Sequence, residues 1–225
     1  MNKNLKSVII GVLVLFIYLI YNYILLGILS IFNINFASLT LITKQLISLI
    51  SEFIVITIVI YIYRKDLYEA FKSLTDVKFS KYIKYWFLAI GLMIISNIII
   101  TMFTLIETSS NQEAIISTLY KAPIYTCIMS IIFAPILEEL VFRLSFRKIF
   151  NSNILFIVTS GLFFGFMHVS SPNSIAEFLY IIPYSIPGVI FAYTLTKSKN
   201  IYVPIGLHFI HNTIMMLIQL FIMLH

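Results

Sequence analysis

Residues 134–147, APILEELVFRLSFR, combine a long apolar run with ionisable side chains. Two adjacent glutamates, Glu138 and Glu139, stand in this run together with an arginine, Arg143. Ionisable groups inside a membrane-spanning segment are costly unless they are paired or hydrated, and where they occur they are usually functional. We therefore treat these three residues as the first part of a functional site.

The composition around this stretch is that of a membrane protein. The chain has 225 residues, of which 60% are hydrophobic and 11% charged, whereas a soluble domain contains about 25% charged residues. Several apolar runs have the length of about 20 residues that crosses a hydrocarbon core of about 30 Å. Without water to satisfy the backbone, such runs must form helices. The sequence therefore predicts an all-α fold, a polytopic membrane helix bundle, with residues 1–225 as a single integral membrane domain.

The apolar runs predict about seven transmembrane helices. We expect them at about residues 7–32, 45–63, 85–106, 124–146, 153–169, 175–196 and 201–224. Residues 1–122 hold the first three spans and their loops, and the candidate functional groups fall mainly in residues 123–225. In the first part, Glu52 is the only charge of its span. It is either a distant supporting group or a side chain that reaches an interface.

The basic residues of the loops predict the orientation of the bundle. One set of loops holds only Lys44 and Lys121. The opposite set holds Lys3, Lys6, Arg64, Lys65, Lys72, Lys78, Lys81, Lys84, Arg147, Lys148, Lys197 and Lys199. Loops on the cytoplasmic side are enriched in lysine and arginine, so we expect the N-terminus inside and the C-terminus outside. The net charge of +6 comes mainly from these basic loop residues, which the membrane topology explains. We therefore expect the chain to interact with the lipid bilayer and not with nucleic acid.

Two polar stretches between the spans are expected to have structure of their own. Residues 64–84 mix aromatic and basic side chains, which predicts an amphipathic segment at the inner membrane surface. The pattern Ser110-x-x-Glu113 is a capping box and predicts a short helix within residues 107–121 on the outer side. Glu177, near the outer edge of the sixth span, is expected to be solvated.

Glu138 and Glu139 face different directions if their stretch is helical. Residues four apart share a helix face, so Glu139 and Arg143 can form an ion pair. Glu138 is turned by about 100° from Glu139 and about 140° from Arg143, which leaves it free to point into a cavity. A carboxylate in such a place suits the role of a general base. The structural alternative is a helix-packing ion pair near the inner interface, which leaves Glu138 without a role.

Prolines are expected to interrupt two of the spans. Pro135 has no N–H donor, so it frees a carbonyl group near residue 131 and bends the helix. Such a bend makes room for a water-filled pocket next to Glu138. Pro183 and Pro187 predict that the sixth span is broken and gates the access of a substrate.

Further polar residues occur in the later apolar runs. His168 follows Phe164 by one helical turn, on the same face. His208 and Asn212 are also four residues apart and can together address a water, an oxyanion or a metal ion. His211, three residues after His208, is a competing candidate. The structural alternative for each of these residues is a hydrogen bond between helices.

Together, these groups can hydrolyse a bond with water. A glutamate can act as the general base while a histidine or an asparagine stabilises an oxyanion. Glu138, His168 and His208 can alternatively hold one zinc ion, because two histidines and a glutamate form a ligand set of hydrolytic zinc. The motifs H-E-x-x-H, G-x-S-x-G and G-x-G-D are absent from the sequence. A serine or aspartyl intramembrane protease is therefore disfavoured.

The ordered set of motifs resembles the CPBP family, which comprises CAAX prenyl endopeptidases, bacteriocin-processing proteins and abortive-infection (Abi) proteins. The family pattern is E-E-x-x-x-R, then F-x-x-x-H, then H-x-x-x-N. Here the three blocks are Glu138-Glu139-x-x-x-Arg143, Phe164-x-x-x-His168 and His208-x-x-x-Asn212. They stand on separate predicted helices within about residues 134–214, and the first three spans show nothing comparable.

The resemblance implies an intramembrane endopeptidase whose catalytic core is residues 123–225. It implies that Glu138 activates the attacking water. The residues expected to position water, an oxyanion or a metal ion are His168, His208 and Asn212, and the supporting residues are Glu139, Arg143 and Phe164. The resemblance leaves two mechanisms open, a zinc metalloprotease and a metal-free glutamate mechanism.

The expected function is hydrolysis of a membrane-associated peptide or protein in a bacterial cell membrane. Lysine far outnumbers arginine and isoleucine is plentiful, which indicates an AT-rich bacterial genome and favours a bacteriocin or signalling-peptide precursor as substrate. One alternative is a non-proteolytic immunity or scaffold protein on the same fold, which would not need the Glu-His-His-Asn set. A small transporter with a proton relay is a weaker alternative, because the sequence shows no repeat symmetry.

Overall fold

A computed structural model describes residues 5–224 of the chain. Lys3, placed above in an inner loop, and His225 lie outside these residues. Almost every described residue lies in a helix, and the described part of the chain contains no β-strand. The all-α prediction is therefore confirmed.

The helices follow one another with short connections. The longer ones are α1 (Leu5–Ile31), α2 (Leu41–Lys72), α3 (Ser80–Thr104), α4 (Ser110–Lys121), α8 (Asn153–His168), α9 (Ile181–Ser198) and α10 (Tyr202–Leu224). The segment between α4 and α8 consists of α5 (Pro123–Cys127), a π-helical segment (Ile128–Phe133), α6 (Ala134–Glu138), a second π-helical segment (Glu139–Ser145) and α7 (Phe146–Ile149). Short 3₁₀ turns occur at Phe36–Ser38, Leu74–Asp76 and Ala176–Tyr180.

Six helical segments of the described chain are long and apolar enough to cross a membrane. They are Leu5–Ile31, Leu41–Lys72, Ser80–Thr104, Pro123–Ile149, Ala176–Ser198 and Tyr202–Leu224. At the place of the expected fifth span, α8 is apolar but has 16 residues, or about 24 Å of helix against a hydrocarbon core of about 30 Å. The chain is thus a multi-pass integral membrane protein, with one helix shorter than the others.

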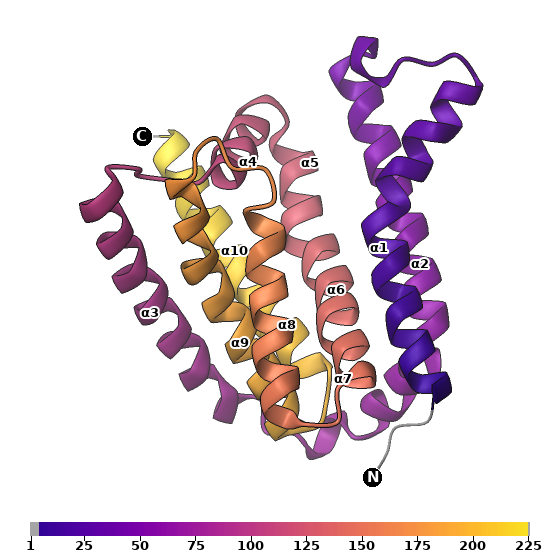
Figure 1. Ribbon diagram of the computed structural model, residues 1–225, viewed down its shortest axis with the longest axis vertical. Coiled ribbons are helices and arrows are strands. Elements are labelled where there is room, and N and C mark those ends of the chain that lie inside the picture. Colours follow the sequence, from indigo (N-terminus) through magenta and orange to yellow (C-terminus); the bar gives the residue numbers. More distant parts are fainter. Residues whose placement is uncertain (1–4, 225) are drawn as a thin grey trace.

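The helices enclose the segment that carries the two glutamates. Figure 1 shows α1 and α2 as a hairpin on one side of the bundle and α3 on the other. Between them, α8 packs along α9, and α10 contacts α3, α6 and α9. The second π-helical segment and α7 pack against α1. The main hydrophobic core joins Val59 of α2, Phe142, Phe156 of α8 and Ala192 of α9.

The close approach of α8 and α9 depends on glycine. A Cβ atom on Gly165 of α8 would lie 2.8 Å from the Ile181 carbonyl oxygen, and one on Gly188 of α9 would lie 2.9 Å from the Gly161 carbonyl oxygen. Small residues at such a crossing let two backbones pack tightly within a membrane. This contact fixes the height of His168, the last residue of α8.

The C-terminal end of α2 differs from the sequence prediction. The helix does not end at Tyr63 but continues to Lys72. Residues 64–72 consist mostly of good helix formers and contain neither glycine nor proline, and Lys72 places a positive charge in the last turn. The second span therefore extends beyond its expected end, while the amphipathic segment at the inner membrane surface stays a prediction. That stretch is the end of α2, a short connection and the start of α3.

The expected break at Pro183 and Pro187 is also absent, since α9 runs through both residues from Ile181 to Ser198. Pro183 lies in the first turn, where an N–H group has no helical partner in any case. In an α-helix, the N–H of residue 187 would bond the carbonyl of residue 183. Two prolines four residues apart therefore remove one helical hydrogen bond, which the packing of α9 tolerates.

The end of the bundle that holds α4 is closed by α4 and the segment before α9. The N-cap of α4 is Ser109, which accepts from Gln112 N at 3.3 Å, one residue earlier than the expected capping box. Ser110 instead donates through its backbone N–H and its hydroxyl to Glu177. Glu177 is 4% exposed and also accepts from Asn173 N at 2.7 Å. The expectation of a solvated Glu177 is wrong, because its carboxylate is buried and accepts from Asn173 N and from the free N–H group of Ser110 at the start of α4.

Candidate active site

The backbone that carries the glutamates is π-helical on both sides of α6. One π-helical segment, Ile128–Phe133, precedes α6, and a second, Glu139–Ser145, begins directly after Glu138. Such segments are rare and occur frequently at functional sites. The backbone on either side of Pro135 is thus a widened, π-helical one.

Asn212 is held by a carbonyl group that Pro135 leaves free. In a π-helix each N–H group bonds the carbonyl five residues earlier. Pro135 has no N–H group, so the carbonyl of Ser130 lacks its π-helical partner. Asn212 on α10 donates to this carbonyl through Nδ2 at 2.8 Å. The freed carbonyl is therefore that of Ser130, next to the expected position, and it orients a predicted site residue.

The ion pair expected between Glu139 and Arg143 is present and buried. Arg143 Nε lies 2.9 Å from Glu139 Oε2, and Arg143 Nη2 donates to Oε1 at 3.2 Å. Both side chains are 0% exposed. Arg143 Nη1 also donates to Ser160 Oγ on α8 at 2.8 Å, and Ser160 donates to the Phe142 carbonyl. Because both buried charges are matched and hydrogen-bonded, the pair forms a fixed support behind the cavity.

His208 lies between the two glutamates. Its Nδ1 atom donates to Glu139 Oε1 at 3.0 Å, and its Nε2 atom lies 3.8 Å from Glu138 Oε2. Since the carboxylate of Glu139 accepts at Nδ1, we infer that neutral His208 presents an Nε2 lone pair toward Glu138. The side chain of Glu138 is 17% exposed, in contrast to that of Glu139. One glutamate therefore orients the imidazole ring, and the other faces the cavity.

His168 is oriented in a similar way at the end of α8. Its Nδ1 atom bonds the Phe164 carbonyl at 2.9 Å, so its Nε2 atom is the acceptor of the neutral ring. The ring stacks on Tyr184 of α9 with 4.8 Å between centroids. Phe164 also contacts His208, at 5.8 Å between centroids, and the Arg143 guanidinium lies 4.9 Å from its ring centre. Phe164 thus packs between the groups that it was expected to support.

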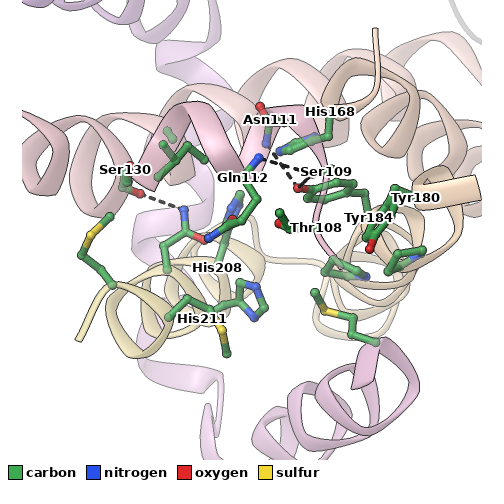
Figure 2. A pocket seen from close by; sticks show the side chains of 18 of the residues that line it. Thr108, Ser109, Asn111, Gln112, Ser130, His168, Tyr180, Tyr184, His208 and His211 are labelled. Atoms are coloured by element: carbon green, nitrogen blue, oxygen red, sulfur yellow. Dashed lines mark hydrogen bonds between the residues drawn. The ribbon is translucent and has the colours of Figure 1, made fainter. Parts of the chain in front are cut away.

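A single cavity of about 440 Å³ brings the predicted catalytic residues together. The residues of the three motifs that line it are Glu138, Phe164, His168, His208 and Asn212, with His211 beside them. Figure 2 shows His208 and His211 of α10 facing the same space as His168 and Tyr184. The opposite end of the cavity is lined by polar residues before and within α4: Glu107, Thr108, Ser109, Asn111 and Gln112. The cavity therefore runs from the glutamates to the end of the bundle that holds α4.

Sequence reasoning missed several residues of the site. Ser130 and Ser160 were not singled out, although each binds a motif residue. The sequence feature that points to Ser130 is its position five residues before Pro135, which leaves its carbonyl free in a π-helix. Tyr184, the stacking partner of His168, has no signal in the sequence. Glu52 accepts from the Tyr21 hydroxyl at 2.8 Å and does not line the cavity.

His211 stays a candidate beside the motif residues. It is 9% exposed, lines the cavity, and its Nδ1 atom has no hydrogen-bond partner among the described residues. Being three residues after His208, it lies on a neighbouring part of the same helix face. A buried imidazole nitrogen without a partner is costly, which makes this atom available to a bound molecule.

The side chains expected to bind zinc do not converge on one point. Within residues 5–224, no group of three histidine, cysteine, aspartate or glutamate side chains is arranged to hold a metal ion. His208 does have the second contact typical of a metal-binding histidine, a carboxylate at Nδ1. The set Glu138, His168 and His208 nevertheless does not form a ligand cluster as it stands. We therefore derive no reaction step through a metal, and the zinc site stays a prediction.

The comparisons with known proteins match the same part of the chain. Residues 120–214 match the model of the family described as type II CAAX prenyl endopeptidase Rce1-like. These residues are thus similar to the Rce1-like family. The match covers α5 to most of α10 and all three motifs, so the resemblance read from the motifs is confirmed over these residues.

Two bacterial proteins are similar to this chain. It is 30% identical over 122 residues to the "Putative membrane peptidase YdiL" of Bacillus subtilis (strain 168), which covers 53% of this chain and 47% of that protein. It is 31% identical over 137 residues to the "Membrane-embedded CAAX protease MroQ" of Staphylococcus aureus (strain USA300), which covers 57% of this chain and 52% of that protein. The chain thus spans about half the length of these curated relatives. No solved structure matches it.

Proposed function

We propose that the chain is an intramembrane endopeptidase that hydrolyses a membrane-associated peptide or protein with water activated by Glu138. The observation that carries the proposal is the distance of 3.8 Å between Glu138 Oε2 and His208 Nε2. This separation is too long for a direct hydrogen bond, yet one water can lie about 2.8 Å from both atoms. Its hydrogens then point to two acceptors, which leaves its lone pairs free for attack.

The reaction begins when Glu138 accepts a proton from this water. The water oxygen forms a bond to the carbonyl carbon of the scissile peptide, and the carbonyl oxygen becomes an oxyanion. The C–N bond then breaks, and the proton held by Glu138 passes to the leaving nitrogen. A positioned acid–base group of this kind contributes about 10²–10⁴-fold to the rate. Glu139 and Arg143 do not exchange protons in this scheme; they hold His208 in place.

Asn212 is the oxyanion donor in this proposal. Its Nδ2 atom carries two hydrogens, of which one bonds the Ser130 carbonyl at 2.8 Å. The second is available to an oxygen in the cavity. Because the first bond fixes the amide before substrate binds, Asn212 needs no reorganisation, and such a donor contributes about 10²–10³-fold to kcat. His168 adds an acceptor at Nε2 for a peptide N–H or a second water.

The cavity suits a peptide better than a small polar molecule. Apolar side chains on its walls include Met93 and Met215, and amide groups at its α4 end include Asn111 and Gln112. An extended peptide needs apolar contacts for its side chains and polar partners for its backbone. The names of the bacterial relatives, a membrane peptidase and a CAAX protease, support this substrate class. We propose a bacteriocin or signalling-peptide precursor as the substrate.

Cleavage in a reconstituted bilayer tests the proposal. Full-length chain in liposomes is incubated with membrane-anchored peptide precursors, and products are identified by mass spectrometry. We expect cleavage by the wild type and by Glu113→Gln, an exposed glutamate on α4. We expect a loss of about hundredfold or more for Glu138→Gln and His208→Ala. Equal processing by all four proteins would contradict the proposal and favour a non-proteolytic immunity or scaffold protein.

The zinc prediction needs a separate test. The wild-type protein is treated with a chelator, its zinc content is measured, and cleavage is assayed before and after zinc is restored. Zinc-dependent recovery would support a metalloprotease with Glu138, His168 and His208 as ligands. Full cleavage at zero zinc would support the metal-free glutamate mechanism derived above.

A further inference from the structure

A second cavity lies at the other end of the bundle from α4. It has a volume of about 640 Å³ and opens where α2, α7 and α9 end. Three of the residues that line it are cations from different elements, namely Lys65, Arg147 and Lys199. Their neighbours in the lining include the polar side chains of Ser73, Asn153 and Thr196. None of these residues belongs to the candidate active site.

The cations of this cavity lack counter-charges. Two carboxylates also line it, but Asp66 is paired with Lys148 at 2.8 Å and Glu69 with Lys72 at 3.8 Å. Within residues 5–224, Lys65, Arg147 and Lys199 form no ion pair. The cavity therefore presents a net positive charge that the protein itself does not neutralise.

Arg147 is the most informative of the three cations. Its Nη1 atom is buried and has no hydrogen-bond partner among the described residues. Its guanidinium carbon lies 5.5 Å from the ring centre of Phe156, which supports one side of the group. A buried guanidinium N–H without an acceptor is costly unless a bound anion satisfies it. Arginine stacked on an aromatic ring, with free N–H groups at its edge, is well suited to bind phosphate.

The frame around the cavity is held by hydrogen bonds between distant parts of the chain. Asn200, which is 1% exposed, donates to the Ala70 carbonyl at 2.7 Å and to Ser73 Oγ at 3.2 Å. This ties the turn between α9 and α10 to the end of α2. Tyr63 of α2 likewise bonds Ser145 at 2.7 Å, directly before α7. The three cations are thus presented by elements that are already fixed to one another.

We propose that this cavity binds the phosphate group of an anionic phospholipid. The basic loops lie at this end of the bundle, and anionic lipids concentrate at the cytoplasmic surface that such loops face. Basic pockets between transmembrane helices at that surface are known to accept phosphate headgroups. Arg147 supplies directed hydrogen bonds, and Lys65 and Lys199 supply charge. The site is independent of the hydrolytic proposal, because it shares no residue with the cavity around Glu138.

Lipid binding to the full-length protein tests this site. The protein is purified in a neutral detergent and titrated with phosphatidylglycerol or phosphatidylcholine, and bound lipid is counted by native mass spectrometry. We expect one saturable phosphatidylglycerol site and weaker binding of phosphatidylcholine. Arg147→Gln should weaken phosphatidylglycerol binding by at least about tenfold, and Lys199→Gln by about fivefold. The matched control is Lys81→Gln, an exposed lysine at the same end that does not line the cavity, and it should change binding less than twofold.

Further variants and ligands distinguish loss of lipid binding from loss of folding. Arg147→Lys retains the charge and should bind better than Arg147→Gln, and melting temperatures without lipid should show that all variants fold. Binding that is equal in wild type and Arg147→Gln, or reduced as much by Lys81→Gln, would overturn the proposal. In the last experiment, the protein is titrated with inorganic phosphate alone. If it occupies the site and raises the melting temperature as much as the lipid does, the ligand is free phosphate and the lipid assignment is wrong.

Discussion

At the scale of single residues, the two adjacent glutamates have very different surroundings. Glu139 is contacted by three nitrogen atoms, Nε and Nη2 of Arg143 and Nδ1 of His208. Glu138 has one nitrogen near it, at 3.8 Å, and faces the cavity. A carboxylate with all its partners in place is a structural group, whereas one that faces a cavity can accept a proton from water. The geometry thus supports the proposed division of roles between Glu138 and Glu139.

Arg143 allows a direct measurement of the structural role. Replacing it by methionine leaves the buried Glu139 carboxylate without its main counter-charge. Loss of one partner of a buried ion pair costs about 3–5 kcal/mol, so we expect Arg143→Met to lower the free energy of unfolding in detergent micelles by that amount. Arg64→Met is the control, because Arg64 is exposed and its loss should cost less than about 0.5 kcal/mol. Equal unfolding curves for the two variants would contradict a structural role of Arg143.

The sequence predicts a contact within one helix of the site better than the contacts between different helices. The spacing of Glu139 and Arg143 was sufficient to predict their ion pair, because both lie on one helix. The contact of His208 with Glu139 was not predictable in the same way, since it depends on how α10 packs against the π-helical segment. The same holds for Ser160, which reaches Arg143 only because α8 packs close to it. Helix periodicity carries no information about such contacts.

At the scale of the elements, the contact between α8 and α9 is a place where one methyl group is decisive. A Cβ atom at Gly165 would stand 2.8 Å from the Ile181 carbonyl oxygen and 2.8 Å from Ser185 N. Backbone atoms cannot move as easily as the end of a side chain, so α8 and α9 must separate. We expect Gly165→Ala to destabilise the protein by about 1–3 kcal/mol, measured as a lower melting temperature in detergent.

Gly91 provides the matched control for this substitution. It lies in α3, and a Cβ atom there has nothing within 4 Å. Replacing a helical glycine by alanine in open space favours the helix by about 0.5–1 kcal/mol. Gly91→Ala should therefore keep or raise the melting temperature. Destabilisation of similar size by both variants would mean that the close crossing of α8 and α9 is not the cause.

Glu177 controls a second element, the start of α4. Its carboxylate accepts from Ser110 N, from the Ser110 hydroxyl and from Asn173 N. Glu177→Gln replaces one carboxylate oxygen, which accepts, by an NH₂ group, which donates. Because this group faces other donors, the contact between residue 177 and Ser110 should open. We expect faster hydrogen exchange at residues 107–121, while Glu113→Gln leaves exchange there unchanged. If both variants exchange like the wild type, Glu177 does not hold α4 over the cavity.

Element boundaries were the least predictable part of the fold. Glu177 was expected in water because it lies near the outer edge of the sixth span, yet its carboxylate binds Ser110 at the start of α4, which is distant in sequence. The end of α2 was placed at the last apolar residue, although helix formation continued through charged residues to Lys72. Pro183 and Pro187 were expected to break α9, but four-residue spacing limits their effect to one hydrogen bond. Hydropathy locates apolar runs, while capping and packing decide where helices end.

At the scale of the whole molecule, the two cavities mark opposite ends of the bundle. The candidate catalytic cavity reaches the end with α4, and the basic cavity opens where α2, α7 and α9 end. The orientation predicted from the basic loops places α4 outside.

Single cysteines in a Cys127→Ser background test this orientation by labelling with a membrane-impermeant maleimide. We expect Lys121→Cys to be labelled on intact cells and Lys81→Cys only after permeabilisation. The reverse pattern would contradict the orientation and place the catalytic cavity on the cytoplasmic side.

The two glutamates offer the sharpest test of the central claim, that Glu138 activates water while Glu139 holds the site together. Glu138→Gln and Glu139→Gln are compared for melting temperature and for cleavage of the same membrane-anchored peptide. The account predicts that Glu138→Gln melts like the wild type and cleaves at least about hundredfold more slowly, whereas Glu139→Gln melts earlier because Arg143 loses its counter-charge. Wild-type cleavage by Glu138→Gln, or an equal loss of melting temperature in both variants, would contradict it.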